Sequence, residues 1–170
     1  MVLGILFACI KPAPPAQAEG VPVAVTAILI PVSGEASGAP ASFEAGIAGV
    51  LDAHGAVPSF STSPVEAARV AGKADSGQRL AVLRETHDGA VLLVETAPSY
   101  YSEMNGQYRW TVGVTLTLAE GAGAPVEAQF DVPVFLRYHH EREAEAVDAA
   151  TPVVARRVAQ LVDAWVAGRE

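Results

Sequence analysis

Tyr108-Arg109-Trp110-Thr111-Val112-Gly113-Val114-Thr115-Leu116-Thr117-Leu118 is the stretch that decides the fold of this chain. Its side chains alternate between apolar and polar or small, a period typical of a β-strand with one buried and one solvated face. The pattern repeats from Val126 to Val134, after a short Gly/Ala segment at 121–123. The two stretches predict an antiparallel hairpin, whose wet face carries Arg109, Thr111, Thr115, Thr117, Glu127, Gln129 and Asp131.

Three further strands are predicted on the N-terminal side of this hairpin. Residues 21–32 and 90–96 are apolar at both alternating sets of positions, which indicates central strands buried on both faces. Residues 57–60 form a shorter strand between them. The chain therefore supplies five strands, of which the last two follow the third directly.

Helical patterns separate and follow these strands. Residues 43–54 repeat apolar side chains at helical spacing, with Ser42 as the expected N-cap. Ser63-Pro64-Val65-Glu66 predicts a capping box that opens a helix to about residue 71. Residues 78–87 predict another helix, capped by Asp75 or Ser76. Residues 141–168 predict a long amphipathic helix that Pro152 kinks, or restarts with Thr151 as a cap.

Together these elements predict an α/β (α+β) fold in the order β-α-β-α-β-β-β-α. Right-handed crossovers place the first strand between the second and the third. The mixed five-stranded sheet then has the strand order 2-1-3-4-5, with helices packed on it. We expect one α/β domain over residues 21–170, preceded by an export or lipidation signal and a Pro/Ala-rich tether over residues 1–20.

The composition limits the classes of function. The chain has 11 Lys and Arg against 19 Asp and Glu, a net charge of −8. This balance argues against nucleic acid, which requires a basic surface, and against charge-driven adsorption to anionic membranes. The one cysteine excludes an intrachain disulfide framework and a cysteine-based zinc cluster.

The N-terminal segment indicates export. Residues 1–10 are apolar but too few to cross a bilayer, and they fit the core of a secretory signal. Leu6-Phe7-Ala8-Cys9 resembles the bacterial lipobox, which implies lipidation of Cys9 and a membrane anchor. Two alternatives stay open. Cleavage after Ala16-Gln17-Ala18 would leave Glu19 as the N-terminus, or Cys9 is only an apolar residue of a discarded signal.

No motif predicts catalysis, a cofactor or a metal. The chain has no Gly-x-Ser-x-Gly elbow, and the loop at 33–38 has neither phosphate-binding signature. The cluster His139-His140-Glu141-Arg142-Glu143 suits a polar strand-to-helix junction, because adjacent histidines do not chelate without remote partners. We therefore expect a protein that is not an enzyme.

The tyrosine-rich segment 98–108 is the first candidate for binding. It is read as a hairpin loop longer than the usual two to five residues. Tyrosines supply rigid amphipathic contact area in recognition surfaces. The alternative is that Tyr108 and Trp110 are core residues and that the other tyrosines cover a sheet end. The partner-binding candidates are Tyr100, Tyr101, Met104, Tyr108 and Arg109.

The order of these elements resembles the N-terminal domain of the Tol translocation protein and related envelope lipoproteins, including penicillin-binding-protein activators and curli-secretion-type lipoproteins. The matching segments are residues 23–31, 50–55, 87–94 and 108–114 and the C-terminal helix. The resemblance implies an accessory or scaffold protein without catalytic residues. We expect a periplasm-facing lipoprotein of the outer membrane that binds an envelope protein. The alternatives are a subunit of a homo-oligomeric envelope complex, and a cell-wall ligand binder or hydrolase.

Overall fold

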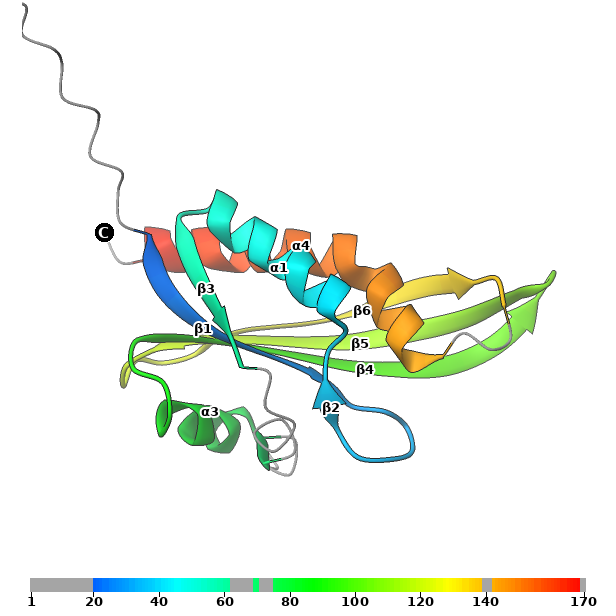
Figure 1. Cartoon of the computed structure of the whole chain (residues 1–170), viewed down its shortest axis with the longest axis horizontal. Helices are drawn as coiled ribbons and strands as arrows, with labels where there is room; N and C mark the ends of the chain where they lie inside the picture. Colours follow the sequence, from blue (N-terminus) through cyan, green and yellow to red (C-terminus); the bar gives the residue numbers. More distant parts are fainter. Residues whose placement is uncertain (1–19, 62–68, 71–74, 139–141, 169–170) are drawn as a thin grey trace, which may run out of the picture.

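The computed structural model describes residues 20–61, 69–70, 75–138 and 142–168. One mixed sheet carries helices on both faces (Figure 1). The elements, in chain order, are β1 (Val21–Leu29), β2 (Ser37–Gly38), α1 (Ala41–Ala53), β3 (Ala56–Phe60), α3 (Ser76–Arg84), β4 (Ala90–Met104), β5 (Gln107–Glu120), β6 (Val126–Leu136) and α4 (Glu143–Ala167).

The α/β fold class is confirmed. β1 pairs in parallel with β3 and with β4, and β4, β5 and β6 form an antiparallel meander. The sheet differs from the predicted order by one additional strand, the two-residue β2, which pairs antiparallel with the end of β1. Two residues are too few for an alternating pattern, so the sequence gives no signal for β2.

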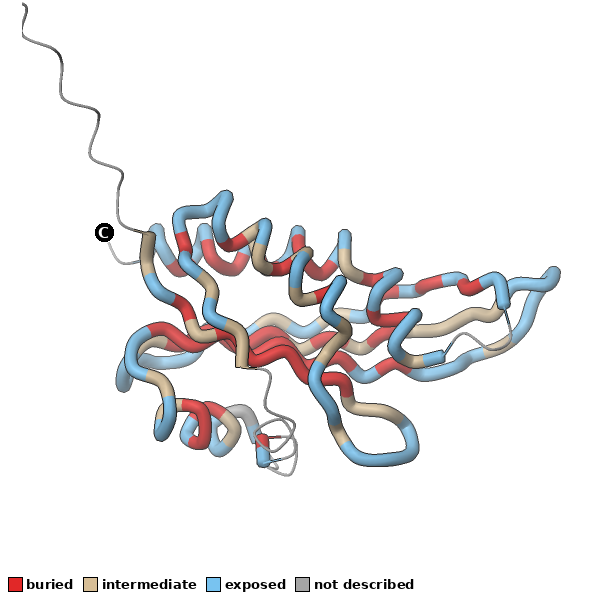
Figure 2. Tube along the Cα trace, viewed as in Figure 1, coloured by how far each residue is buried: buried red, intermediate tan, exposed pale blue. Residues whose placement is uncertain are grey.

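Two apolar clusters lie on opposite faces of the sheet. The larger packs α1 and α4 on one face, against side chains such as Val25, Leu92 and Leu116. The smaller packs Leu80 and Leu83 of α3 on the other. Figure 2 shows the buried residues concentrated in the middle of the sheet and on the sheet-facing sides of the helices. The hairpin face that carries Thr111, Thr115 and Thr117 was predicted to be solvent-exposed, but it is exposed only in part. Helix α3 covers one end of this face, and Thr117 is fully buried.

Helices α1 and α4 run in parallel and are joined along their length. Ser42 Oγ donates to Asp148 Oδ1 at 2.6 Å, and His54 Nδ1 lies 2.6 Å from Asp163 Oδ1. Between these contacts, Gly46 faces the methyl group of Thr151. The prediction of Ser42 as the N-cap was wrong: Pro40 precedes the first helical residue, and the Ser42 hydroxyl bonds to the other helix instead.

Helix α4 continues through Pro152 without a restart. The Thr151 hydroxyl donates to the carbonyl of Val147 at 3.4 Å, as a residue inside a helix does, so the prediction of a cap there was wrong. Proline removes one backbone hydrogen bond, while apolar residues on both sides of it, such as Val147 and Val158, are buried against the sheet. The packing of α4 on the sheet therefore outweighs the free-energy cost of the hydrogen bond that Pro152 removes.

Helix α3 is fixed by its cap and by an ion pair. Asp75 accepts a hydrogen bond from the backbone of Gln78 at 2.8 Å, which confirms the predicted cap. Arg79 Nη1 donates to both oxygens of Glu95 at 2.6 and 2.7 Å, and Glu95 is only 4% exposed. The predicted capping box of Ser63 and Glu66 lies outside the described residues, as do His139, His140 and Glu141.

The segment 98–108 is a β-hairpin, so the prediction of a long loop was wrong. β4 and β5 remain paired as far as Met104 and Gln107, and the turn between them has only two residues. Asn105 and Gly106 have φ angles of 53° and 72°, as a type I′ turn requires. Since β1 pairs with β4 only up to Thr96, the hairpin extends well past β1.

Candidate partner-binding surface

Exposed aromatic side chains gather where the hairpin extends past the helices. We call this region the hairpin end, defined as residues 98–110 of β4, the turn and β5, with residues 133–138 in and after β6. Of the ten large hydrophobic side chains that are exposed in the described part of the chain, it holds Tyr100, Tyr101, Met104, Phe135 and Tyr138. Figure 2 shows this end as largely exposed.

One face of the hairpin end is organised around Arg109. The Arg109 guanidinium carbon lies 5.5 Å from the centre of the Tyr101 ring and 5.7 Å from the centre of the Phe135 ring. β5 runs between β4 and β6, so the two rings come from the strands on either side of it. Tyr101 and Phe135 are 73% and 55% exposed, which leaves the stack open to solvent.

A β-bulge places Tyr101 beside Arg109. The pairing of β4 with β5 shifts between Tyr100 and Ser102, so Tyr101 is an extra residue opposite Arg109. Bulges of this kind redirect a side chain and recur next to functional sites. Met104 pairs with Gln107 beyond the bulge and falls on the same face as Ser102 and Arg109, because residues two apart on a strand share a face.

The opposite face of the hairpin end is more closely packed. Tyr100 meets Trp110 edge to face, with ring centres 5.6 Å apart and an interplanar angle of 66°. Tyr108 and Trp110 pack against the larger core cluster, as the core interpretation predicted. The buried indole N–H of Trp110 has no hydrogen-bond partner among the described residues. This is unusual, because most buried donors in proteins are hydrogen-bonded.

The five sequence-predicted binding residues thus share one end of the sheet but divide between its faces. Tyr101, Met104 and Arg109 lie on one face, and Tyr100 and Tyr108 lie on the other. Their role in binding stays a prediction. Sequence reasoning missed Phe135, although continuing the outward-facing alternation of Glu127, Gln129 and Asp131 through residue 133 would have reached it.

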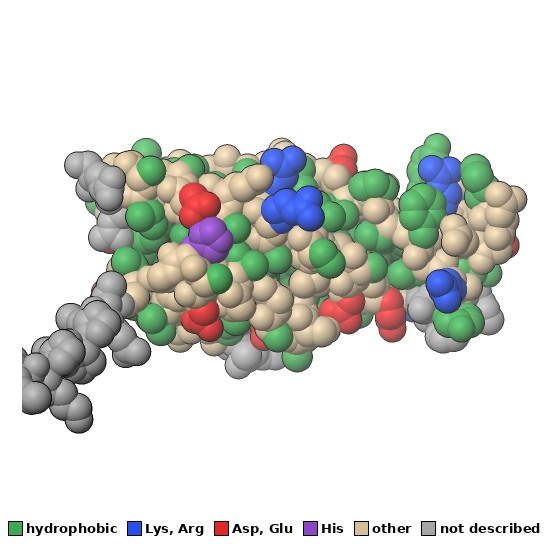
Figure 3. Space-filling view, turned by 90° about the horizontal axis from the view of Figure 1, so that it is seen from above, with side chains coloured by type: hydrophobic (Ala, Val, Ile, Leu, Met, Phe, Trp, Pro, Cys, Tyr) green, Lys and Arg blue, Asp and Glu red, His purple; other side chains and the backbone are tan. Residues whose placement is uncertain are grey.

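Arg109 has no ion pair or hydrogen bond within the part of the chain that the structure describes; its two recorded contacts are with rings. This is unusual in a chain of net charge −8, where carboxylates outnumber cations. Figure 3 shows basic side chains beside hydrophobic ones at the end of the molecule where the hairpin lies. The surface therefore combines apolar contact area with an unpaired positive charge.

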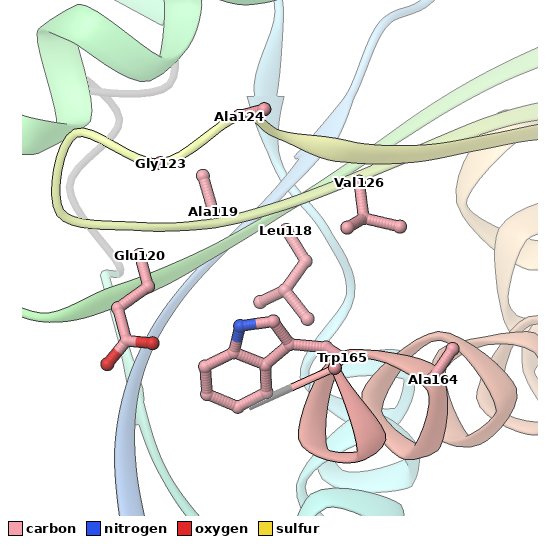
Figure 4. Close-up of a pocket in the computed structure, with 9 residues that line it drawn as sticks. Leu118, Ala119, Glu120, Gly123, Ala124, Val126, Ala164 and Trp165 are labelled. Carbon is pink, nitrogen blue, oxygen red and sulfur yellow. The ribbon is translucent and has the colours of Figure 1, made fainter. Parts of the chain in front are cut away.

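Pockets also lie elsewhere on the fold, and one of about 380 Å³ is lined by Arg84, His87 and Asp88. A pocket of about 270 Å³ lies between the β5–β6 connection and the end of α4, with Trp165 and Leu118 in its wall (Figure 4). Glu120 is the one ionisable side chain among the described residues that line it. Among the described residues, no group of three or more His, Cys, Asp and Glu side chains could hold a metal ion.

Burial raises the pKa of Glu44, which lies in the first turn of α1. None of the helices in the described ranges combines the length and the apolar character that a membrane crossing needs.

Comparisons with known proteins give no family assignment. No family model matches the chain, and no curated protein matches it. Among solved structures, the PelC dodecamer from Paraburkholderia phytofirmans is 20% identical, with a TM-score of 0.45 over 87% of this chain and 93% of that one. A minor lipoprotein from Acinetobacter baumannii is 15% identical (TM-score 0.41, 82% and 90%). Lipoprotein GNA1162 from Neisseria meningitidis is 14% identical (TM-score 0.41, 83% and 99%). TM-scores below 0.5 do not assign a function to this chain, and the resemblance to the Tol group stays a hypothesis.

Proposed function

We propose that this chain is a non-catalytic lipoprotein of the bacterial envelope, anchored in the outer membrane through Cys9, which binds a protein partner in the periplasm through the hairpin end. The observation that carries the proposal is the exposed stack of Tyr101, Arg109 and Phe135. Aromatic and arginine side chains are enriched in the parts of protein interfaces that contribute most binding energy.

The position of the hairpin end suits a tethered binding module. Val23 at the start of β1 pairs with Ala90 at the start of β4, so the N-terminus of the domain lies level with the beginning of β4. The 15 residues of β4 span about 45 Å at roughly 3.3 Å per step. The hairpin end lies at the opposite end of the long axis from the start of β1 (Figure 1). A chain anchored at Cys9 would be tethered at the β1 end of the domain, opposite this surface.

A subunit of a homo-oligomer is the second candidate. The observation that favours it is β6, an 11-residue strand at the edge of the sheet. An edge strand offers backbone donors and acceptors to another chain, although Pro133 within β6 lacks a donor. A cell-wall ligand binder or hydrolase stays a hypothesis.

Site-specific photocrosslinking in the source bacterium tests the binding surface. A benzophenone amino acid replaces Tyr101 in one strain and Val57 in another. Val57 is a matched control, because it is 54% exposed but lies on β3 near the other end of the molecule. We expect a discrete heterologous adduct from position 101 that is weakened by Phe135→Ser and absent from position 57. The same adduct from both positions, or no adduct from position 101, would contradict the proposal.

Intact mass of the membrane-fraction protein tests the anchor separately. A lipidated mass on the wild-type protein that is lost in Cys9→Ala would support lipidation. A protein that begins at Glu19 would instead identify cleavage after Ala18 and a free periplasmic module.

A further inference from the structure

We propose that Tyr101, Arg109 and Phe135 form a carboxylate-binding site that takes an Asp or Glu side chain from an acidic segment of the protein partner. The inference rests on the proposed function and gives the chemistry of the contact. It requires three things of the surface: a cation with free donors, a rigid position for that cation, and no carboxylate of this chain already bound to it.

The rigid position comes from three adjacent strands. Arg109 pairs with Phe135 directly across β5 and β6, and the bulge in β4 adds Tyr101 on the other side. Ring faces attract a guanidinium through their quadrupole, most strongly at distances below about 6 Å. The distances of 5.5 and 5.7 Å lie within this range. A flexible side chain is thereby held in a limited set of positions before any ligand arrives.

The guanidinium of Arg109 has donors for hydrogen bonding besides its ring contacts. Arginine carries five N–H donors, and none of those of Arg109 has a recorded acceptor among the described residues. A carboxylate accepts two of these donors in parallel, which gives a short, charge-assisted pair.

Three other arginines of the described part of the chain show how Arg109 differs from them. Arg79 is paired with Glu95 and Arg69 with Glu85. Arg157 also lies over a ring, that of Phe130 at 5.7 Å, but it donates to Gln160 Oε1 at 3.0 Å. Among the described residues, Arg109 has contacts with its two rings and with no hydrogen-bond acceptor.

An acidic protein segment fits this surface better than a lipid headgroup does. The exposed apolar side chains around Arg109, including Met104, match the composition of protein interfaces. Tyr101 also lies about 36 Å along β4, at roughly 3.3 Å per residue, from Ala90, which pairs with Val23 near the start of β1. A headgroup of the anchoring membrane would be expected nearer to the start of β1.

Titration with an acidic peptide tests the site directly. The full chain with Cys9→Ala is labelled with ¹⁵N and titrated with hexaglutamate, and with hexaglutamine as the neutral control. We expect shifts of the Arg109 Nε–H signal and of the Tyr101 and Phe135 backbone signals with hexaglutamate only. Arg109→Gln should weaken binding about 10- to 100-fold, as expected for the loss of a charge-assisted pair. Arg109→Lys should also weaken it, because an ammonium cannot form the bidentate pair. Arg157→Gln, at the other stacked arginine, should leave it unchanged.

The outcomes separate this inference from the proposed function. Equal binding of hexaglutamate by the wild type and Arg109→Gln would overturn the carboxylate site, even if the photocrosslink at position 101 persists. Binding to phosphatidylglycerol vesicles that depends on Arg109, without any response to hexaglutamate, would also overturn it and indicate a lipid surface. Loss of the photocrosslink with an intact hexaglutamate response would contradict the proposed function, whereas the carboxylate-binding site at Arg109 would remain supported.

Discussion

Replacement of Gly46 by alanine tests the packing of α1 on α4. A Cβ atom at position 46 would lie 2.4 Å from the Thr151 Cγ2 methyl, which is closer than non-bonded carbon atoms approach each other. Alanine in a helix interior is favoured over glycine by about 1 kcal/mol. Overpacking of a well-packed contact costs about 1 to 3 kcal/mol. We therefore expect Gly46→Ala to lower the free energy of unfolding by about 0 to 2 kcal/mol.

Gly49 provides the matched control on the same helix. No atom lies within 4 Å of a Cβ built at position 49, so Gly49→Ala should stabilise the protein by about 1 kcal/mol. The two alanine variants should then differ by about 1 to 3 kcal/mol, or roughly 2 to 12 °C in Tm for a domain of this size. Thermal unfolding followed by circular dichroism measures this difference.

A double-mutant cycle identifies the colliding methyl group. Thr151→Ser removes Cγ2 and keeps the hydroxyl that bonds to the Val147 carbonyl. The combination Gly46→Ala with Thr151→Ser should recover about 1 to 3 kcal/mol relative to the sum of the single changes. If Gly46→Ala is as stabilising as Gly49→Ala, or if the cycle shows no coupling, the close approach of the two helices is not as described.

The remaining predictions concern α3, the hairpin turn, a titrating carboxyl and the anchor. Arg79→Met leaves the buried Glu95 carboxylate unpaired and should cost about 3 to 5 kcal/mol in urea unfolding, whereas the double variant with Glu95→Leu should cost clearly less. Gly106→Ala, at a φ of 72°, should cost about 1 kcal/mol and lower the Tm by a few degrees; an unchanged Tm would argue against the type I′ turn. The raised pKa of Glu44 means that the folded state binds its proton more tightly than the unfolded chain does. Wild type should therefore gain stability relative to Glu44→Gln as the pH falls from 7 through the folded pKa towards 4.5, and a constant difference would contradict this. Cys9→Ala should move the protein from the detergent phase to the aqueous phase on phase separation, and retention in the detergent phase would count against a lipid on Cys9.

The parts of the fold that could be predicted depend on long, regular patterns. The alternation over residues 108–118 predicted β5 and its buried face, and the runs that are apolar on both faces predicted β1 and the start of β4 as central strands. These patterns are reliable because the side chains on one face of a strand share one environment, either the core or the solvent. α4 was also predicted, but its continuity through Pro152 depends on tertiary packing that a local proline rule does not include.

The hairpin end shows why the rest was missed. Residues 98–104 mix proline, serine and tyrosine without a clean alternation, partly because the bulge at Tyr101 shifts the register by one residue. The Asn105-Gly106 pair was an available signal for a two-residue turn and would have corrected the expected loop. The stack around Arg109 joins side chains from three strands. Its existence depends on cross-strand register, which no single segment of the sequence encodes.

The most direct test of the central claim is the photocrosslink from position 101 in the source organism, compared with the crosslink from position 57. The account predicts a heterologous protein adduct at position 101 that Phe135→Ser weakens, and no such adduct at position 57. A position 101 strain without an adduct, or one whose adduct contains only a second copy of this chain, would contradict the claim that the hairpin end binds an envelope partner.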